Sequence, residues 1–317
     1  METSILNPTQ PPPPAKTDPL RTFLGFCVGL LTAIVFGLGG FWLVYNDIGQ
    51  MGGVLFLLLP LATGLATALV ARRLEILIGS LVLAALMCTT ILLIMGLEGW
   101  VCVLMSSPLI FGGLAIGALL GWLIRYCTRE WRQERLARLG ILLVLPFFLL
   151  GADKVEKSHT GPRAETITNT LVTTASREKS WEQLKTFDRV EGTKGLLMKI
   201  GLPVPVSCTM TGEGVGATRT CYFEQGHIEE RVTEWNPPSS MKFEITTFDV
   251  PGRPWLSFKD ASYDLTTEGD HTVITRRTTI VSRLSPAWYW RPLEKIGVET
   301  EHEYLFEEVK RKIEAAK

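Results

Sequence analysis

Charged residues are almost absent from long stretches of the first half of this 317-residue chain. Residues 1–152 contain 9 Lys and Arg and 7 Asp and Glu, whereas residues 153–317 contain 23 and 25. Uncharged apolar runs of about 20 residues match the thickness of a lipid bilayer. The scarcity of charge therefore divides the chain into a membrane-helical part and a water-soluble part.

Other absences argue against several classes of function. The chain has no block of Lys and Arg and its net charge is formally zero, which argues against a nucleic-acid partner. No CxxC or His/Cys spacing indicates a metal site, and neither a phosphate-binding glycine loop nor HExxH occurs. The apolar runs carry no ionisable side chain in their middles, which argues against an ion channel or proton-coupled transporter. We therefore expect neither a metal nor a cofactor.

Composition predicts four segments along the chain. Residues 1–21 hold four consecutive prolines and are expected to form a disordered tail. Residues 22–152 are expected to form about five transmembrane helices, 153–163 a short tether, and 164–317 one soluble domain. The last apolar run is only 14 residues long, so a re-entrant segment is the alternative to a fifth span. The predicted spans are 23–45, 52–71, 74–97, 100–124 and 139–152.

The basic residues predict how these spans are oriented. Lys and Arg precede the first run, separate the second from the third, and separate the fourth from the fifth, whereas the other two turns carry none. Because Lys and Arg next to spans remain in the cytoplasm, we expect a cytoplasmic N-terminus in an inner or plasma membrane. The soluble domain is then extracytoplasmic. If 139–152 does not cross, the domain is cytoplasmic instead.

A stripe of small residues marks the fourth apolar run. Gly113, Gly117 and Gly121 repeat every four residues. Glycines at this spacing let two helix backbones approach closely in lipid. The stripe predicts either tight packing within the bundle or self-association of two chains.

The soluble domain is predicted to be α+β, with a curved antiparallel sheet packed against a long terminal helix. Ser176 is expected to cap a helix after the first strand, and Pro292 with Gly297 to interrupt the chain before the last helix, 299–315. Such a sheet and helix can enclose an apolar cavity. The expected strands are 165–176, 206–212, 217–224, 227–235, 241–248, 261–267 and 272–283.

Residues 201–245 read GLPVPVSCTMTGEGVGATRTCYFEQGHIEERVTEWNPPSSMKFEI, and 285–295 read SPAWYWRPLEK. Together with the closing amphipathic helix, they resemble the SRPBCC superfamily, also called START-like or helix-grip, in its polyketide cyclase/dehydrase-like branch. The resemblance covers about residues 164–316 and does not include the apolar half. It implies a cavity for a hydrophobic ligand such as a lipid, polyketide or quinone. Members include enzymes, carriers and regulators without a shared catalytic motif, so no catalytic residue is assigned.

Two charged residues fall on apolar strand faces. Because side chains alternate along a strand, Glu230 shares a face with Ile228 and Val232, and Arg276 shares one with Ile274. A buried charge is tolerated only when it is paired or strongly hydrogen-bonded. The hypothesis is that Glu230 and Arg276 lie in the cavity, paired or binding a ligand head group. The alternatives are a purely structural ion pair and a solvent-facing side of the sheet.

Two cysteines lie almost symmetrically about the glycine-rich turn of the predicted hairpin. Cys208 and Cys221 would face one another on neighbouring strands. An extracytoplasmic location would permit a disulfide between them. The alternative is two reduced strand residues.

The remaining polar and aromatic candidates are not selected by any spacing. His227 and His271 begin strands and are expected to be solvated turn residues. Asp249, Tyr263 and Glu213 are capable of acid–base chemistry in principle. The aromatic residues Trp255, Trp288, Tyr289 and Trp290 are expected either to pack the final helix on the sheet or to lie at a membrane interface.

The resulting interpretation is a membrane-anchored START-like domain that binds a lipid or lipid-like molecule, in lipid handling or sensing. The alternatives are a polyketide cyclase-type enzyme and a sensory or assembly module without a ligand. An apolar cavity with few polar groups favours binding. Several inward acids, His or Tyr near one point favour catalysis, and a filled interior favours the module.

Overall fold

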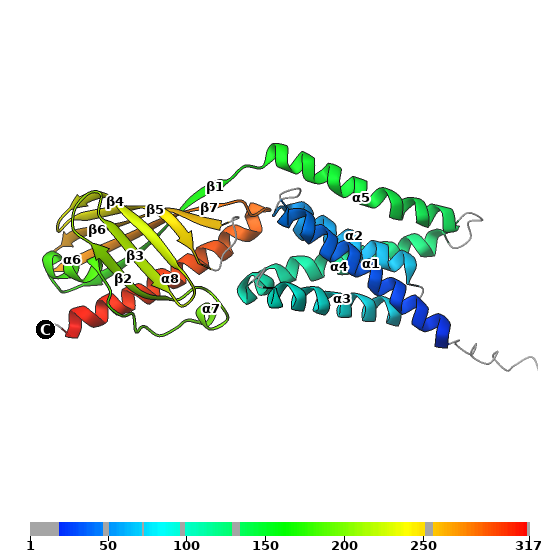
Figure 1. The fold of residues 1–317 in the computed structure, drawn as a ribbon, viewed down its shortest axis with the longest axis horizontal. Helices are drawn as coiled ribbons and strands as arrows, with labels where there is room; N and C mark the ends of the chain where they lie inside the picture. Colours follow the sequence, from blue (N-terminus) through cyan, green and yellow to red (C-terminus); the bar gives the residue numbers. More distant parts are fainter. Residues whose placement is uncertain are drawn as a thin grey trace, which may run out of the picture.

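A computed structural model describes residues 19–46, 51–71, 73–95, 99–128, 134–250 and 256–315. Almost all of the predicted tail, 1–21, lies outside these residues. The chain forms a helical bundle (19–159) and a sheet domain (163–315), which lie end to end (Figure 1).

The helical bundle contains the apolar runs. Four of its helices, among the residues that the structure describes, are long and apolar enough to cross a membrane: α1, α3, α4 and α5. Five spans were predicted, but the run 52–71 forms a shorter helix over Val54–Val70, whose first turn is π-helical and whose interior is mostly buried. The bounds are α1 Pro19–Tyr45, η1 Val54–Leu58, α2 Leu59–Val70, α3 Leu74–Ile94, α4 Trp100–Thr128 and α5 Glu134–His159.

The run 139–152, too short alone to decide between a span and a re-entrant segment, belongs to the 26-residue helix α5. The helix continues past Ala152 because the next seven residues contain neither Gly nor Pro, and Lys157 pairs with Asp153 one turn earlier at 3.8 Å. It ends just before Gly161 and Pro162. Most of the predicted tether is therefore helix.

The glycine stripe of α4 faces α2 of the same chain. A Cβ atom added at Gly117 would lie 1.9 Å from the carbonyl oxygen of Leu61, and one at Gly121 would lie 2.6 Å from the Cβ of Ala68. A Cβ atom at Gly113 would lie 2.9 Å from the Cβ of Pro60, which is less crowded but still too close. The stripe therefore serves packing within the bundle. Self-association through these three glycines is contradicted, because α2 already covers them.

The sheet domain confirms the predicted α+β arrangement. Its seven antiparallel strands have the order β1-β7-β6-β5-β4-β3-β2, so that neighbours in sequence are mostly neighbours in space. Ser176 caps α6 as predicted by accepting a hydrogen bond from the amide of Lys179. The bounds are β1 Arg163–Thr173, α6 Arg177–Lys185, α7 Leu196–Lys199, β2 Pro205–Thr211, β3 Thr218–Phe223, β4 His227–Asn236, β5 Ser240–Asp249, β6 Leu256–Glu268, β7 His271–Ser282 and α8 Ala287–Ala315.

The terminal helix α8 is longer than predicted. It passes without a break through both Pro292 and Gly297, so the predicted interruption there was wrong. Pro292 deprives only the carbonyl of Trp288 of its helical partner. Trp288 is 69% exposed, so the solvent side of α8 is where this one hydrogen bond is lost.

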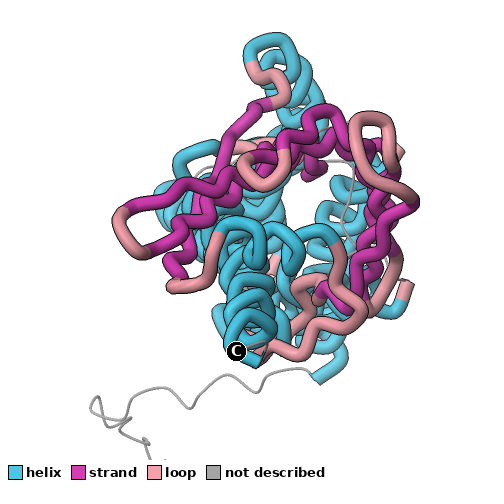
Figure 2. Tube along the Cα trace, turned by 90° about the vertical axis from the view of Figure 1, so that its left-hand side faces the viewer, coloured by secondary structure: helices cyan, strands magenta, loops and turns pink. Residues whose placement is uncertain are grey.

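The strands curve around α8, as the view along the long axis shows (Figure 2). The core of the sheet domain joins the inner faces of the strands to one stripe of the helix. Its fully buried members include Phe243, Leu265, Ile274, Val309 and Ile313. Burial alternates along β4 and β7 with the period of two that a half-buried sheet requires.

The sheet domain packs directly on the end of the helical bundle. Trp290 packs on Phe56 with tilted rings whose centroids are 4.8 Å apart, and the Tyr289 hydroxyl donates to the carbonyl of Met105 at 2.5 Å. Of the predicted aromatic cluster, Tyr289 and Trp290 therefore pack against apolar helices, whereas Trp288 is exposed and Trp255 lies outside the described residues. Glu156 of α5 strengthens the same end by accepting from the amides of Gly53 and Val54 at 2.6 and 2.9 Å.

Candidate functional site

One cavity of about 1140 Å³ runs from the interior of the sheet domain into the helical bundle. This volume slightly exceeds the range of about 300–1,000 Å³ that is typical of ligand pockets in proteins. On the sheet side its lining includes Cys208, Arg219, Cys221, Glu230, Ala261, Tyr263, Arg276, Glu301 and Leu305. On the bundle side it includes Ala33, Phe41, Leu81, Ala84, Ala85, Leu92, Trp100, Ser106 and Leu114.

The first charged pair on this lining joins neighbouring strands. Arg219 of β3 stands opposite Glu230 of β4 in the sheet register, and its Nη1 donates to Glu230 Oε2 at 3.0 Å. Both residues are buried, with 2% and 8% of their surfaces exposed. Glu230 therefore lies in the cavity wall with a partner that the sequence did not indicate.

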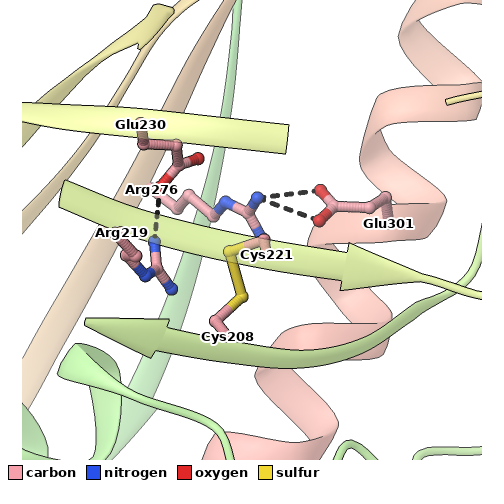
Figure 3. Close-up of a disulfide and its surroundings, with 6 residues drawn as sticks. All are labelled: Cys208, Arg219, Cys221, Glu230, Arg276 and Glu301. Atoms are coloured by element: carbon pink, nitrogen blue, oxygen red, sulfur yellow. Dashed lines mark hydrogen bonds and ion pairs between the residues drawn. A yellow bond between two sulfur atoms is a disulfide. The ribbon is translucent and has the colours of Figure 1, made fainter. Parts of the chain in front are cut away.

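The second pair joins the sheet to the terminal helix (Figure 3). Nη2 of Arg276, on β7, donates to Oε1 of Glu301, on α8, at 3.0 Å and forms an ion pair with Oε2 at 2.9 Å. Burial raises the pKa of Glu301, although Arg276 opposes this. Burial by itself would lower the pKa of Arg276, but Glu301, Tyr263 and Glu230 together raise it. Glu230 and Arg276 thus share one site without forming the direct pair that was considered.

Aromatic rings surround the two guanidinium groups. The Cζ atom of Arg219 lies 4.9 Å from the ring centroid of Phe243, and that of Arg276 lies 5.5 Å from the centroid of Tyr263. Four nitrogens, Nε and Nη2 of Arg219 and Nε and Nη1 of Arg276, are buried and have no hydrogen-bond partner. The site therefore has more donors than its own carboxylates satisfy.

The structure joins Cys208 and Cys221 by a disulfide, with Cα atoms 4.0 Å apart. The two residues are direct partners in the register of β2 and β3, as the symmetric placement about the turn predicted. Both cysteines line the cavity beside Arg219 (Figure 3). The cross-link thus forms part of the cavity wall.

The other candidates divide between surface and cavity. His227 lies 3.8 Å from Asp249 at a partly exposed strand end, and Glu213 pairs with Lys185 on the surface at 2.6 Å. His271 is exposed. Asp249 also lines the cavity but is exposed, whereas Tyr263 lies deep in it with 2% of its surface exposed.

Sequence reasoning missed Arg219 and Glu301. Arg219 lies two residues before Cys221, so alternation along β3 places it on the same face as the disulfide. Glu301 lies four residues before Leu305 and three before Tyr304, which places it inside the apolar stripe of α8. A charged residue within an apolar periodicity was the available signal in both cases.

A buried histidine on α8 next to Glu301 forms hydrogen bonds with two strands of the sheet. His302 has no exposed surface; its Nδ1 donates to Asn169 Oδ1, and its Nε2 accepts from the hydroxyl of Thr278, each at 2.7 Å. Burial first, and then the charge of Arg276, lower the pKa of His302 from 6.5 to about 2. His302 is therefore neutral and holds α8 against β1 and β7.

This pKa predicts how stability depends on pH. The unfolded chain binds a proton at His302 below pH 6.5 while the folded chain does not, so the contribution of neutral His302 is lost as pH falls from 6.5 towards about 2. We expect the variant His302→Gln to lose less stability than the wild type between about pH 7 and about pH 4.5. Denaturant unfolding across this range measures it. The exposed His271→Gln is the matched control, and equal slopes for all three proteins would contradict the assignment.

Among the described residues, no group of three or more His, Cys, Asp or Glu side chains is arranged to hold a metal ion.

The sheet order and the terminal helix that it surrounds decide the fold. The C-terminal half of this chain has a helix-grip fold. The sequence matches no protein-family model and no curated protein. Similar solved structures share 14–17% identity, so they bear on fold alone, and at TM-scores of 0.31–0.34 they add nothing to what the topology of the chain itself shows.

Three of these similar structures come from different organisms. The Aha1 dimer of Colwellia psychrerythraea is 17% identical, with 46% of this chain and 96% of that chain covered and a TM-score of 0.31. The Zhui aromatase/cyclase of Streptomyces sp. R1128 is 14% identical, with 49% and 98% covered and a TM-score of 0.34. Norcoclaurine synthase of Thalictrum flavum, in complex with dopamine and hydroxybenzaldehyde, is 15% identical, with 46% and 86% covered and a TM-score of 0.32.

Proposed function

We propose that this chain is a membrane-anchored protein whose helix-grip domain binds a hydrophobic ligand taken from the surrounding lipid. The observation that carries the proposal is the single cavity shared by the sheet domain and the helical bundle. A molecule with low solubility in water would gain by moving along a continuous apolar path, because its surface need not meet water on the way.

The arrangement of the bundle supports a location at the membrane. The start of α3, which follows Arg73, and the end of α4, which carries Arg125 in its last turn, lie at the end of the bundle away from the sheet domain (Figure 1). Basic turns remain in the cytoplasm, so the sheet domain would be extracytoplasmic, where a disulfide is stable. Digestion of the domain by a protease added to intact cells tests this orientation, and complete protection would contradict it.

Filling the cavity should abolish ligand binding. Ala261 lies on β6, lines the cavity and is 5% exposed. We expect Ala261→Trp to place an indole in the cavity and to reduce the amount of copurified ligand at least tenfold, since each 1.4 kcal/mol of lost binding is about a factor of ten. Native mass spectrometry of the full chain purified in mild detergent, followed by extraction, measures the bound molecule.

The matched control is Ala164→Trp, because Ala164 is an exposed residue of β1 on the same sheet. Both variants are compared by thermal unfolding so that loss of ligand is not confused with loss of fold. A wild-type protein that carries no copurified hydrophobic molecule would contradict the proposed function. Equal ligand content in Ala261→Trp and the wild type would contradict the position of the site.

One observation favours an enzyme as the second candidate. Glu230, Glu301 and Tyr263 lie close to two arginines on the cavity wall, and a buried carboxyl whose pKa is raised is suited to proton transfer. The same extraction distinguishes the candidates. A copurified precursor that differs in mass between the wild type and Glu301→Gln would support catalysis, whereas identical molecules in both would support binding alone.

A further inference from the structure

The charged cluster on the cavity wall consists of Arg219, Glu230, Arg276 and Glu301. It is the part of the lining where two buried cations lie among aromatic rings, away from the apolar helices. Each arginine donates from one nitrogen to its carboxylate partner. The four remaining buried nitrogens have no acceptor. A buried donor left without a partner is costly, so this cluster is built for an additional acceptor.

The free nitrogens of Arg219 have a specific geometry. Nε and Nη2 form the edge of a guanidinium group whose two N–H bonds are parallel, and this edge matches the two oxygens of a carboxylate or phosphate. Nη1 is the nitrogen already engaged with Glu230. A head group at this edge would therefore be bound without breaking the existing ion pair. Arg276 adds Nη1 and Nε as further donors.

We propose that the ligand is an amphiphile with one acidic head group, which Arg219 and Arg276 bind while its apolar body fills the rest of the cavity. This inference rests on the proposed function and specifies the ligand class of the same site. The shared chemistry is an oxyanion, carried by either a carboxylate or a phosphate ester.

The charge balance of the cluster indicates which carboxyl group takes up a proton when the anion binds. Two arginines and two glutamates cancel, so an incoming anion leaves one negative charge in excess unless a carboxyl takes up a proton. Glu301 faces Arg276, and it also interacts with Glu230 and Arg219, while its helix neighbour His302 is neutral. Because burial already raises the pKa of Glu301, its carboxyl is the one to be protonated. Binding of the anion should then be tighter at lower pH.

The test compares three probes that share one C16 chain: palmitic acid, hexadecyl phosphate and 1-hexadecanol. Each displaces a fluorescent apolar probe, 1-N-phenylnaphthylamine, from the full chain in mild detergent. We expect the acid or the phosphate to bind at least about tenfold more tightly than the alcohol, as a charge-assisted hydrogen bond to a buried arginine provides. The stronger of the two anions identifies the head group. Equal affinity of all three probes would overturn the proposal.

Two variants locate the effect at the cluster. Glu301→Gln imitates the protonated carboxyl and should increase the affinity for the anionic probe but not for 1-hexadecanol. The double variant Arg276→Gln/Glu301→Gln replaces the ion pair as a unit, so that no buried charge is left alone, and should reduce the preference for the anion several-fold. An unchanged preference in the double variant would overturn the role of Arg276. If no probe binds to the wild type, the proposed function itself fails, whereas binding of 1-hexadecanol alone overturns only this inference.

Discussion

Replacement of Arg219 by methionine should destabilise the sheet domain by about 3–5 kcal/mol, because it leaves Glu230 buried without its partner. Glu230 is 8% exposed and its hydrogen bond from Arg219 Nη1 is 3.0 Å long. Methionine keeps much of the apolar contact that the arginine stem makes. The loss of stability therefore measures the cost of leaving Glu230 buried without its partner. Urea unfolding monitored by tryptophan fluorescence measures it.

The double variant Arg219→Met/Glu230→Met serves as the control. With both charges removed, no buried ion remains, and we expect most of the lost stability to return. Arg231→Met, which disrupts the surface pair with Glu244, should change stability by no more than about 1 kcal/mol. A single variant as stable as the wild type would show that water reaches Glu230 and that the cluster is not buried.

Alanine at Gly117 should disrupt the helical bundle. Its Cβ atom would lie 1.9 Å from the carbonyl oxygen of Leu61, so α2 and α4 must move apart. Overpacking of this kind costs about 1–3 kcal/mol and sometimes more. Part of the cost should come from the loss of helix contacts along the whole stripe, since Gly113 and Gly121 face the same helix. Thermal unfolding in detergent measures the effect as a lowered Tm.

Gly112 provides a matched control five residues away on α4. A Cβ atom there meets nothing within 4 Å. Gly112→Ala should leave Tm unchanged or raise it, because alanine favours a helix over glycine by about 1 kcal/mol. Equal Tm values for Gly112→Ala and Gly117→Ala would contradict the close contact between α2 and α4.

Local periodicity was sufficient to predict most of the sheet domain. Strand alternation placed Glu230 and Arg276 on faces that the structure buries. The predicted break at Pro292 was wrong because the local rule treats proline as the end of a helix, whereas here only the carbonyl of the exposed Trp288 loses its helical partner. The length of α5 was underestimated because the apolar run alone was counted, whereas polar residues continued the same helix.

The partners of the charged residues could not be predicted from local sequence patterns. Arg219 pairs with Glu230 across a strand register, and Glu301 reaches Arg276 from a helix 25 residues further along the chain. Both pairings depend on how the sheet curves around α8. The junction between the two parts of the chain was equally inaccessible, since no sequence pattern specified that Trp290 would pack on Phe56.

The disulfide restricts how the sheet can open. The two edges of the sheet are β1 and β2, and Cys208 fastens β2 to β3 through Cys221. A disulfide at an edge keeps that strand from separating from its neighbour to admit a bulky ligand. The other edge strand, β1, is paired with β7 along its whole length, from Arg163 to Thr173. We therefore expect a ligand to enter where the cavity reaches the helical bundle and not through either edge of the sheet.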